Sequence, residues 1–104
     1  MDPEKLQQQQ ILEQNLQQLL MQKQQFQSSL IENENALSEL SKTDTAYKII
    51  GSIMIKADKS ELEKELKTRN ETVSIRINNI DKQETMIKER LEKVKKEVLE
   101  TKSE

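Results

Sequence analysis

The residues of this 104-residue chain that could do chemistry do not form the motifs that such chemistry needs. The chain has no cysteine and no histidine, so disulfides, thiolate metal sites and imidazole general bases are excluded. Its one glycine, Gly51, cannot supply a nucleotide-binding loop, which needs several glycines to bring backbone against phosphate. Ser, Thr, Asp, Glu and Lys are plentiful but occur in no nucleophile motif. We therefore expect no enzyme, no metal site and no cofactor.

The composition excludes a conventional globular core. Only 33% of the residues are hydrophobic and 35% are charged, whereas globular domains take about 45–50% of their residues from the apolar types. The composition is not that of a disordered chain either, because Leu, Ile, Val and Phe make up about a quarter of it and the net charge is only −2. These values favour an elongated protein with a narrow apolar seam.

The charge pattern and the start of the chain predict neither a nucleic-acid nor a membrane partner. Charges of both signs are interspersed, whereas nucleic acid requires a basic face. The acidic start at Met1–Glu4 leads into glutamines rather than into the apolar region of a signal peptide. The longest apolar runs are two and three residues, far below the roughly 20 that span a bilayer. We expect a soluble, cytoplasmic protein.

Apolar residues between Leu12 and Leu40 recur in alternating steps of four and three, the pattern of a coiled-coil helix. Polar residues interrupt the seam at Lys23 and Asn33. Glutamines are dense around it, but a low-complexity tract is the weaker interpretation because the leucines keep their phase. Asp2 as cap and Pro3 at the first helical position suit a helix start. We predict a helix over residues 3–43.

The same periodicity returns between Leu66 and Val98, with polar interruptions at Asn70 and Glu84. Capping-box spacing at Asp58 or Ser60 marks the start of this second helix, predicted over residues 59–102. Its outer face carries acid-before-base pairs four residues apart, each worth about 0.2–0.5 kcal/mol. These pairs are Glu63 with Lys67, Glu65 with Arg69, Glu89 with Lys93 and Glu92 with Lys96.

The two seams fit each other in antiparallel order. If the numbers of facing residues add up to 103, Phe26 meets Ile77 and Leu37 meets Leu66. An antiparallel two-helix coiled coil is therefore the predicted architecture.

The same register brings the polar interruptions together. Asn33 falls opposite Asn70, where two amides can hydrogen-bond, and Lys23 comes close enough to Glu84 for an ion pair. Polar residues in a seam fix its register at a cost in stability, and we predict this role for all four residues. The alternative is that they face solvent at wide points of the coil.

Residues 46–57 break the helical period with two runs of β-branched residues around Gly51-Ser52, which suits a type II′ turn. The predicted β-hairpin is apolar on both faces. A lone two-stranded hairpin is marginal in water and its edges are open, so we expect partner subunits to complete it. The alternative is a hairpin that folds back to cap the coil. The expected assembly residues are Ile50, Ile53 and Ile55 on one face and Tyr47, Ile49 and Met54 on the other.

The stretch from Ala46 to Lys56, followed by Lys59-Ser60-Glu61-Leu62 at the start of the second helix, resembles the β-type subunit of prefoldin, most closely the archaeal form. The resemblance covers nearly the whole chain and implies a single prefoldin-like domain over residues 1–104. It also implies a hexamer of two α-type and four β-type subunits, whose hairpins form β-barrels at a central base. The implied function is that of an ATP-independent holdase that captures unfolded chains and delivers them to a group II chaperonin.

Client contact is expected at the end of the helix pair where the chain begins and ends. Helix ends fray because their last backbone groups lack partners within the helix, so apolar side chains there become exposed. The expected contact residues are Met1, Leu6, Ile11, Val98 and Leu99. The alternative function is a structural scaffold or tether without chaperone activity, in which the hairpin is a passive connector.

Overall fold

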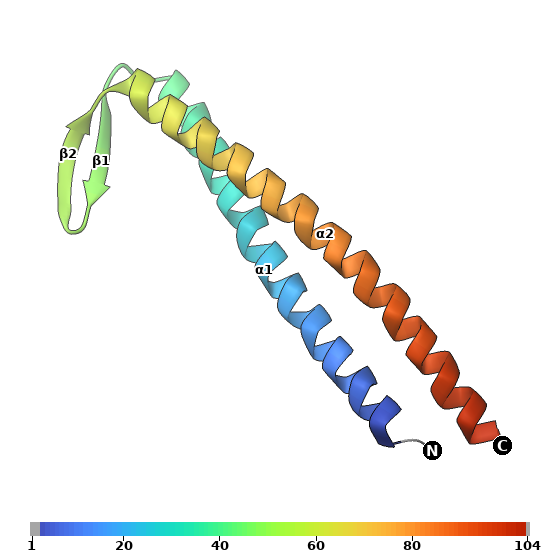
Figure 1. Ribbon diagram of the computed structural model, residues 1–104. Helices are drawn as coiled ribbons and strands as arrows, with labels where there is room; N and C mark the ends of the chain where they lie inside the picture. Colours follow the sequence, from blue (N-terminus) through green and yellow to red (C-terminus); the bar gives the residue numbers. More distant parts are fainter. Residues whose placement is uncertain (1–2, 104) are drawn as a thin grey trace. The chain divides into compact units, whose positions relative to one another are not determined.

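The computed structural model describes the backbone of residues 3–103 and the side chains of residues 3–100. It contains α1 (Pro3–Ser41), β1 (Ala46–Ile50), β2 (Ile53–Ala57) and α2 (Lys59–Ser103), in that order (Figure 1). Helix α1 ends two residues before the expected position, and α2 begins at the expected one. The predicted fold class, two long antiparallel helices with a β-hairpin between them, is confirmed.

The two helices contribute to two compact units. The hairpin unit comprises Phe26–Arg76, and the terminal unit comprises the residues up to Gln25 and those from Ile77 onward. Each unit therefore joins a segment of α1 to a segment of α2. Within the part of the chain that the structure describes, no helix is long and apolar enough to cross a membrane.

The helix ends are held by local hydrogen bonds. At the start of α2, Ser60 N donates to Asp58 Oδ1 at 2.9 Å, so Asp58 rather than Ser60 is the cap. At the end of α1, Ser41 Oγ donates to the carbonyl oxygen of Ser38 at 2.6 Å, and Lys42 N donates to that of Glu39 at 3.1 Å. The expected cap of α1, Asp2, lies outside the described residues.

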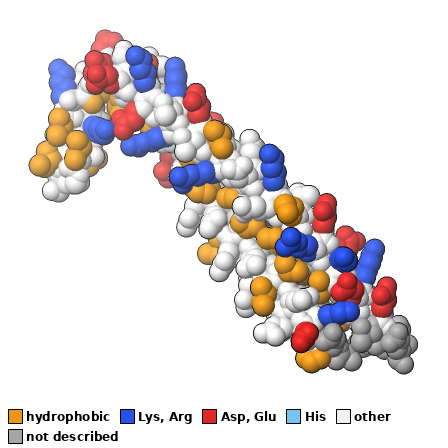
Figure 2. Space-filling view, in the orientation of Figure 1, with side chains coloured by type: hydrophobic (Ala, Val, Ile, Leu, Met, Phe, Trp, Pro, Cys, Tyr) orange, Lys and Arg blue, Asp and Glu red, His pale blue; other side chains and the backbone are white. Residues whose placement is uncertain are grey.

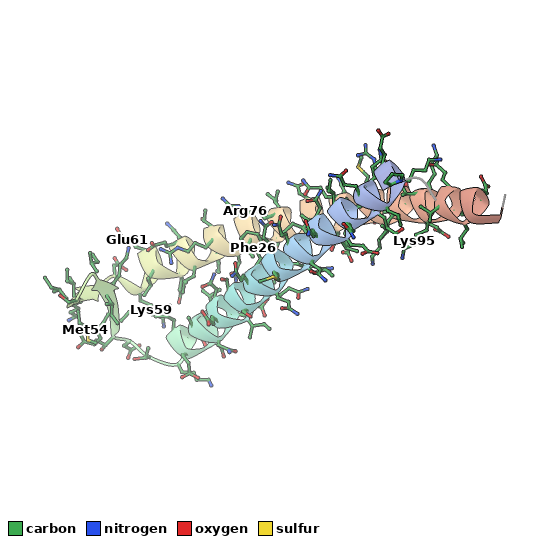
Figure 3. All side chains as sticks on the ribbon, turned by 90° about the horizontal axis from the view of Figure 1, so that it is seen from below. Phe26, Met54, Lys59, Glu61, Arg76 and Lys95 are labelled. Carbon is green, nitrogen blue, oxygen red and sulfur yellow. The ribbon has the colours of Figure 1, made fainter. Side chains whose placement is uncertain are left out.

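Every predicted seam position between Leu12 and Leu40, and between Leu66 and Val98, is buried or half-buried. Two contacts between the helices lie one residue from the predicted register. In the hairpin unit, the Arg76 guanidinium lies 5.6 Å from the centroid of the Phe26 ring (Figure 3). Arg76 directly precedes Ile77, the predicted partner of Phe26, in the sequence. In the terminal unit, Lys5 pairs with Glu97 at 3.6 Å.

The hairpin has the predicted register, with Ile50 opposite Ile53 and Ile49 opposite Met54. Gly51 has a φ of +62°, and none of the described non-glycine residues, Ser52 included, has a positive φ. A type I′ turn would need a positive φ at Ser52 as well, so this pattern is that of the predicted type II′ turn.

The core of the hairpin unit lies at the base of the hairpin. Leu40 at the end of α1, Ala46 at the start of β1 and Leu66 on α2 are all buried and form one cluster. Because this cluster includes residues of both helices and of β1, it fixes the base of the hairpin to the helix pair.

Candidate functional site

The hairpin exposes all six apolar side chains expected to mediate assembly. Their exposed fractions run from 46% for Ile55 to 69% for Ile49. Cross-strand partners share a face, so the register places Ile50, Ile53 and Ile55 on one face and Tyr47, Ile49 and Met54 on the other. Figure 2 shows hydrophobic side chains gathered on the hairpin. The coil leaves these six side chains uncovered, and the buried part of the hairpin is its base at Ala46.

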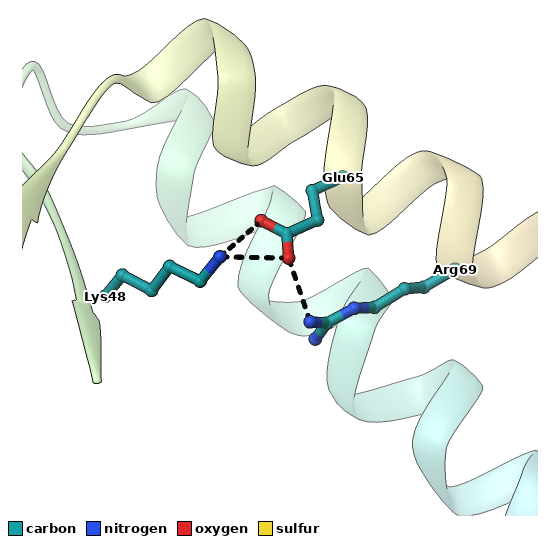
Figure 4. Close-up of polar contacts among 3 residues, drawn as sticks. All are labelled: Lys48, Glu65 and Arg69. Carbon is teal, nitrogen blue, oxygen red and sulfur yellow. Dashed lines mark hydrogen bonds and ion pairs between the residues drawn. The ribbon is translucent and has the colours of Figure 1, made fainter. Parts of the chain in front are cut away.

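An ion-pair cluster connects the hairpin to α2. Lys48 Nζ on β1 lies 3.1 Å from both carboxylate oxygens of Glu65, and Arg69 Nη2 donates to Glu65 Oε1 at 2.9 Å (Figure 4). The hydrogen bond from Lys48, together with the charge of Arg69, lowers the pKa of the Glu65 carboxyl from its ordinary value. Lys48 lies on the same face of the hairpin as Ile50, so its ion pair with Glu65 holds this face towards α2.

A concavity of about 700 Å³ lies beside β1. Its lining includes Leu40, Leu62 and Leu66 from the helices and Tyr47 and Ile49 from β1. In a hairpin with a two-residue turn the residues next to the turn form a hydrogen-bonded pair, so the backbone groups of Tyr47 and Ile49 point away from β2. The concavity thus follows a free strand edge with unpaired backbone donors and acceptors.

The residues expected to contact clients differ in their exposure. Leu99 and Ile11 are exposed, at 64% and 48%, and Leu6 is half-buried. Val98 is buried at 9%, so its side chain is covered in this structure and contact with a client requires the end of the helix to open. Met1 lies outside the described residues.

A groove of about 400 Å³, here called the tip groove, lies between the start of α1 and the end of α2. It was not predicted, because periodicity assigns residues to faces but does not show where two faces leave a gap. Its lining consists of Gln8, Ile11, Leu12, Arg90, Lys93, Val94 and Glu97.

Of the expected register residues, Lys23 and Glu84 form the predicted ion pair, with Nζ 3.5 Å from Glu84 Oε2. The sequence did not indicate that Asp81 lies closer, 2.6 Å from Lys23. The contact with Asp81 is the largest factor that raises the pKa of Lys23. A hydrogen bond from Lys88, ahead of the charge of Lys23, lowers the pKa of Glu84.

The predicted hydrogen bond between the amides of Asn33 and Asn70 is not formed at Asn70 Oδ1. Asn70 Oδ1 is buried and accepts no hydrogen bond from any described residue, so Asn33 does not donate to it. Both amide residues are half-buried in the seam of the hairpin unit. A buried carbonyl without a donor is costly, so Asn70 lowers the stability of this layer.

Comparison with known proteins gives a consistent result. Residues 3–102 match the prefoldin subunit family. The chain is 34% identical to prefoldin subunit beta of Thermococcus onnurineus over 89 residues, which are 83% of this chain and 77% of the relative. It is 39% identical to prefoldin subunit beta of Archaeoglobus fulgidus over 82 residues, covering 76% and 71%. The crystal structure of the prefoldin beta subunit from Thermococcus strain KS-1 superposes with a TM-score of 0.85, 29% identity, and coverage of 96% and 93%.

Proposed function

Because this chain belongs to the prefoldin family of non-enzymatic chaperones, as a β-type subunit, we propose that it forms an ATP-independent holdase with an α-type partner. The proposed complex contains two α-type and four β-type subunits and acts in the cytoplasm. Its hairpins join into β-barrels at a central base. Both compact units of each chain, through which α1 and α2 run without a break, act as one domain.

The observation that carries this proposal is the exposure of apolar side chains on both faces of a two-stranded sheet. Burying one large apolar side chain is worth about 1.5–3 kcal/mol, so six of them provide a strong driving force for association. The free edge of β1 adds backbone hydrogen-bonding groups beside a concavity with apolar lining. A passive connector between helices would need neither feature.

Client capture is proposed in the terminal unit, where Ile11 and Leu99 are exposed among charged residues. Single contacts of this kind are weak, but several subunits in one complex act on the same client at a high effective concentration. Release then needs no nucleotide, in keeping with a chain that has a single glycine and no phosphate-binding loop. The captured chain passes to a group II chaperonin.

Assembly is tested by native mass spectrometry of the chain with an α-type subunit. The wild-type chain should form hexamers. The variants Ile50→Thr/Ile53→Thr/Ile55→Thr and Ile49→Thr/Met54→Thr each remove the apolar character of one face but keep its strand propensity, and both should remain unassembled.

Ile75→Thr is the matched control, because Ile75 on α2 is as exposed as the hairpin isoleucines, at 61%. This variant should still form hexamers. Hexamers formed equally well by either hairpin variant would contradict the proposal. A hexamer that forms but does not suppress the aggregation of an unfolded client would instead indicate a scaffold.

A further inference from the structure

We propose that the tip groove selects apolar segments that carry carboxylates, and that Arg90 and Lys93 bind the carboxylate of such a segment. This inference rests on the proposed capture of clients at the helix ends and specifies which segments are bound there. The occupant is a short stretch of non-native chain with large apolar side chains and a neighbouring Asp or Glu.

The floor of the groove is apolar. Ile11, Leu12 and Val94 line it, and Ile11 is about half exposed, so this side chain is accessible to a bound segment. Met86 precedes Arg90 by one helical turn on the same side of α2 and is 54% exposed, which extends the apolar surface beyond the groove. A volume of about 400 Å³ accommodates a few side chains and excludes a folded domain.

The rim of the groove is cationic. Arg90 and Lys93 line it, and neither forms an ion pair with another residue of the described part. Glu89 lies four residues before Lys93 and was expected to pair with it, but the two are not paired. Among the described residues that line the groove, the only carboxylate is that of Glu97, which already has Lys5 as a partner at 3.6 Å. The groove therefore offers two available cations in a chain whose net charge is −2.

These two cations favour a carboxylate for a physical reason. Arginine holds a carboxylate through two parallel hydrogen bonds, and lysine adds a second charge one turn along the helix. The apolar floor displaces water from one side of the contact, so screening is weaker than at a fully exposed pair. Figure 2 shows hydrophobic side chains between Lys and Arg side chains near the end of the molecule where both termini lie.

The test uses two fluorescent peptides with the same core of leucine and phenylalanine, one flanked by glutamates and the other by lysines. Binding to the assembled complex is measured by fluorescence anisotropy. At low salt the glutamate peptide should bind roughly threefold to tenfold more tightly, the range expected for two partly exposed ion pairs. At about 0.5 M salt this preference should fall towards one, because charges are then strongly screened.

The variant Arg90→Gln/Lys93→Gln should remove the preference and leave binding of the lysine peptide unchanged or stronger. Lys95→Gln/Lys96→Gln is the matched control, because it removes the same charge from the same helix outside the groove. The control should keep the preference for the glutamate peptide. Circular dichroism and native mass spectrometry should show the same helix content and assembly for both variants.

Other outcomes of this experiment distinguish a failure of the proposed charge preference from a failure of the proposed client capture. Equal binding of the two peptides by the wild-type complex, or an equal loss of preference in both variants, would overturn the role of Arg90 and Lys93 while leaving client capture intact. Failure to bind either peptide or to suppress aggregation would overturn both proposals.

Discussion

At the residue scale, the best-defined polar contacts are carboxylates that each hold two cations. Glu65 contacts Lys48 and Arg69, and Glu84 contacts Lys88 and Lys23. In both glutamates the pKa is lowered, first by the hydrogen bond from a lysine. A carboxyl whose pKa is lower in the folded state stabilises that state above its unfolded pKa, and this contribution disappears as the pH falls through the folded pKa.

The free energy of unfolding should therefore fall from about pH 5 downward. Lys23 has a raised pKa, so its contribution is complete at neutral pH and is lost only in strong alkali, as the pH rises through the folded pKa. Urea unfolding followed by circular dichroism at pH 7, 4 and 3 measures this dependence. The variant Glu65→Gln/Glu84→Gln should lose less stability on acidification than the wild type.

Glu89→Gln/Glu92→Gln is the control for this measurement, because both residues are exposed and neither forms an ion pair in the described part of the chain. Its acid sensitivity should match that of the wild type. If Glu65→Gln/Glu84→Gln were as acid-sensitive as the wild type, other carboxyls would have to carry the effect.

Individual polar partners were predictable only where the seam constrains them. The ion pair of Lys23 with Glu84 follows from heptad phase, because both residues occupy positions that face the other helix. Asp81 is adjacent to such a position, so its contact with Lys23 depends on side-chain conformations that periodicity does not specify. The pair of Glu89 with Lys93 has favourable spacing but is not formed, since exposed pairs gain little over hydration.

At the element scale, helix and hairpin boundaries were predictable because each has a local physical signal. The steps of four and three end near Leu40, and the glycine at the turn has the positive φ that a type II′ turn needs. The concavity beside β1 and the tip groove were not predictable, since each depends on how two elements approach in space. Exposure of the hairpin was expected only through the argument that two helices cannot cover both of its faces.

Lys23 and Glu84, here called the charged layer, should lower the free energy of unfolding of the terminal unit and preserve the register of its two helices. Replacing both Lys23 and Glu84 by leucine fills the seam and removes two partly desolvated charges. The side chains of Asp81 and Lys88 are 48% and 60% exposed, although Asp81 Oδ1 itself is buried and loses its contact with Lys23. By comparison with other such ion pairs, the free energy of unfolding should rise by about 1–3 kcal/mol. Urea unfolding of the single and double variants measures this change and the coupling between the two positions.

Register is measured by disulfide trapping in the same two backgrounds. Cysteines at positions 12 and 91 should crosslink in both, because they face each other in the predicted register. Cysteines at 19 and 91 report a shift of one heptad and should crosslink only in the leucine background. The proposed role of the charged layer would be contradicted by a leucine variant that is less stable than the wild type. It would also be contradicted by a leucine variant that shows no crosslink between positions 19 and 91.

At the scale of the whole molecule, the hairpin unit and the terminal unit each expose apolar side chains, and the two apolar surfaces differ in kind. The hairpin carries six exposed apolar side chains on a regular sheet, which suits permanent association with other subunits. Near the chain ends, Ile11 and Leu99 are separate exposed side chains among charged and polar residues. Such a surface suits weak contacts with many sequences, which become effective when several subunits act together.

Removing the apolar side chains at the ends should therefore weaken client capture without affecting assembly. Each Ile11→Ser or Leu99→Ser change removes apolar contact worth about 1 kcal/mol, and several subunits multiply the loss when they hold one client. The double variant should form hexamers by native mass spectrometry but delay the aggregation of an unfolded client, followed by light scattering, at least about tenfold less effectively than the wild type. Ile31→Ser/Ile75→Ser removes isoleucines of similar exposure, 58% and 61%, from the hairpin unit and should leave suppression unchanged. Equal loss in both variants would mean that clients contact the full length of the helices, because the only relevant difference between the two pairs is their position along the chain.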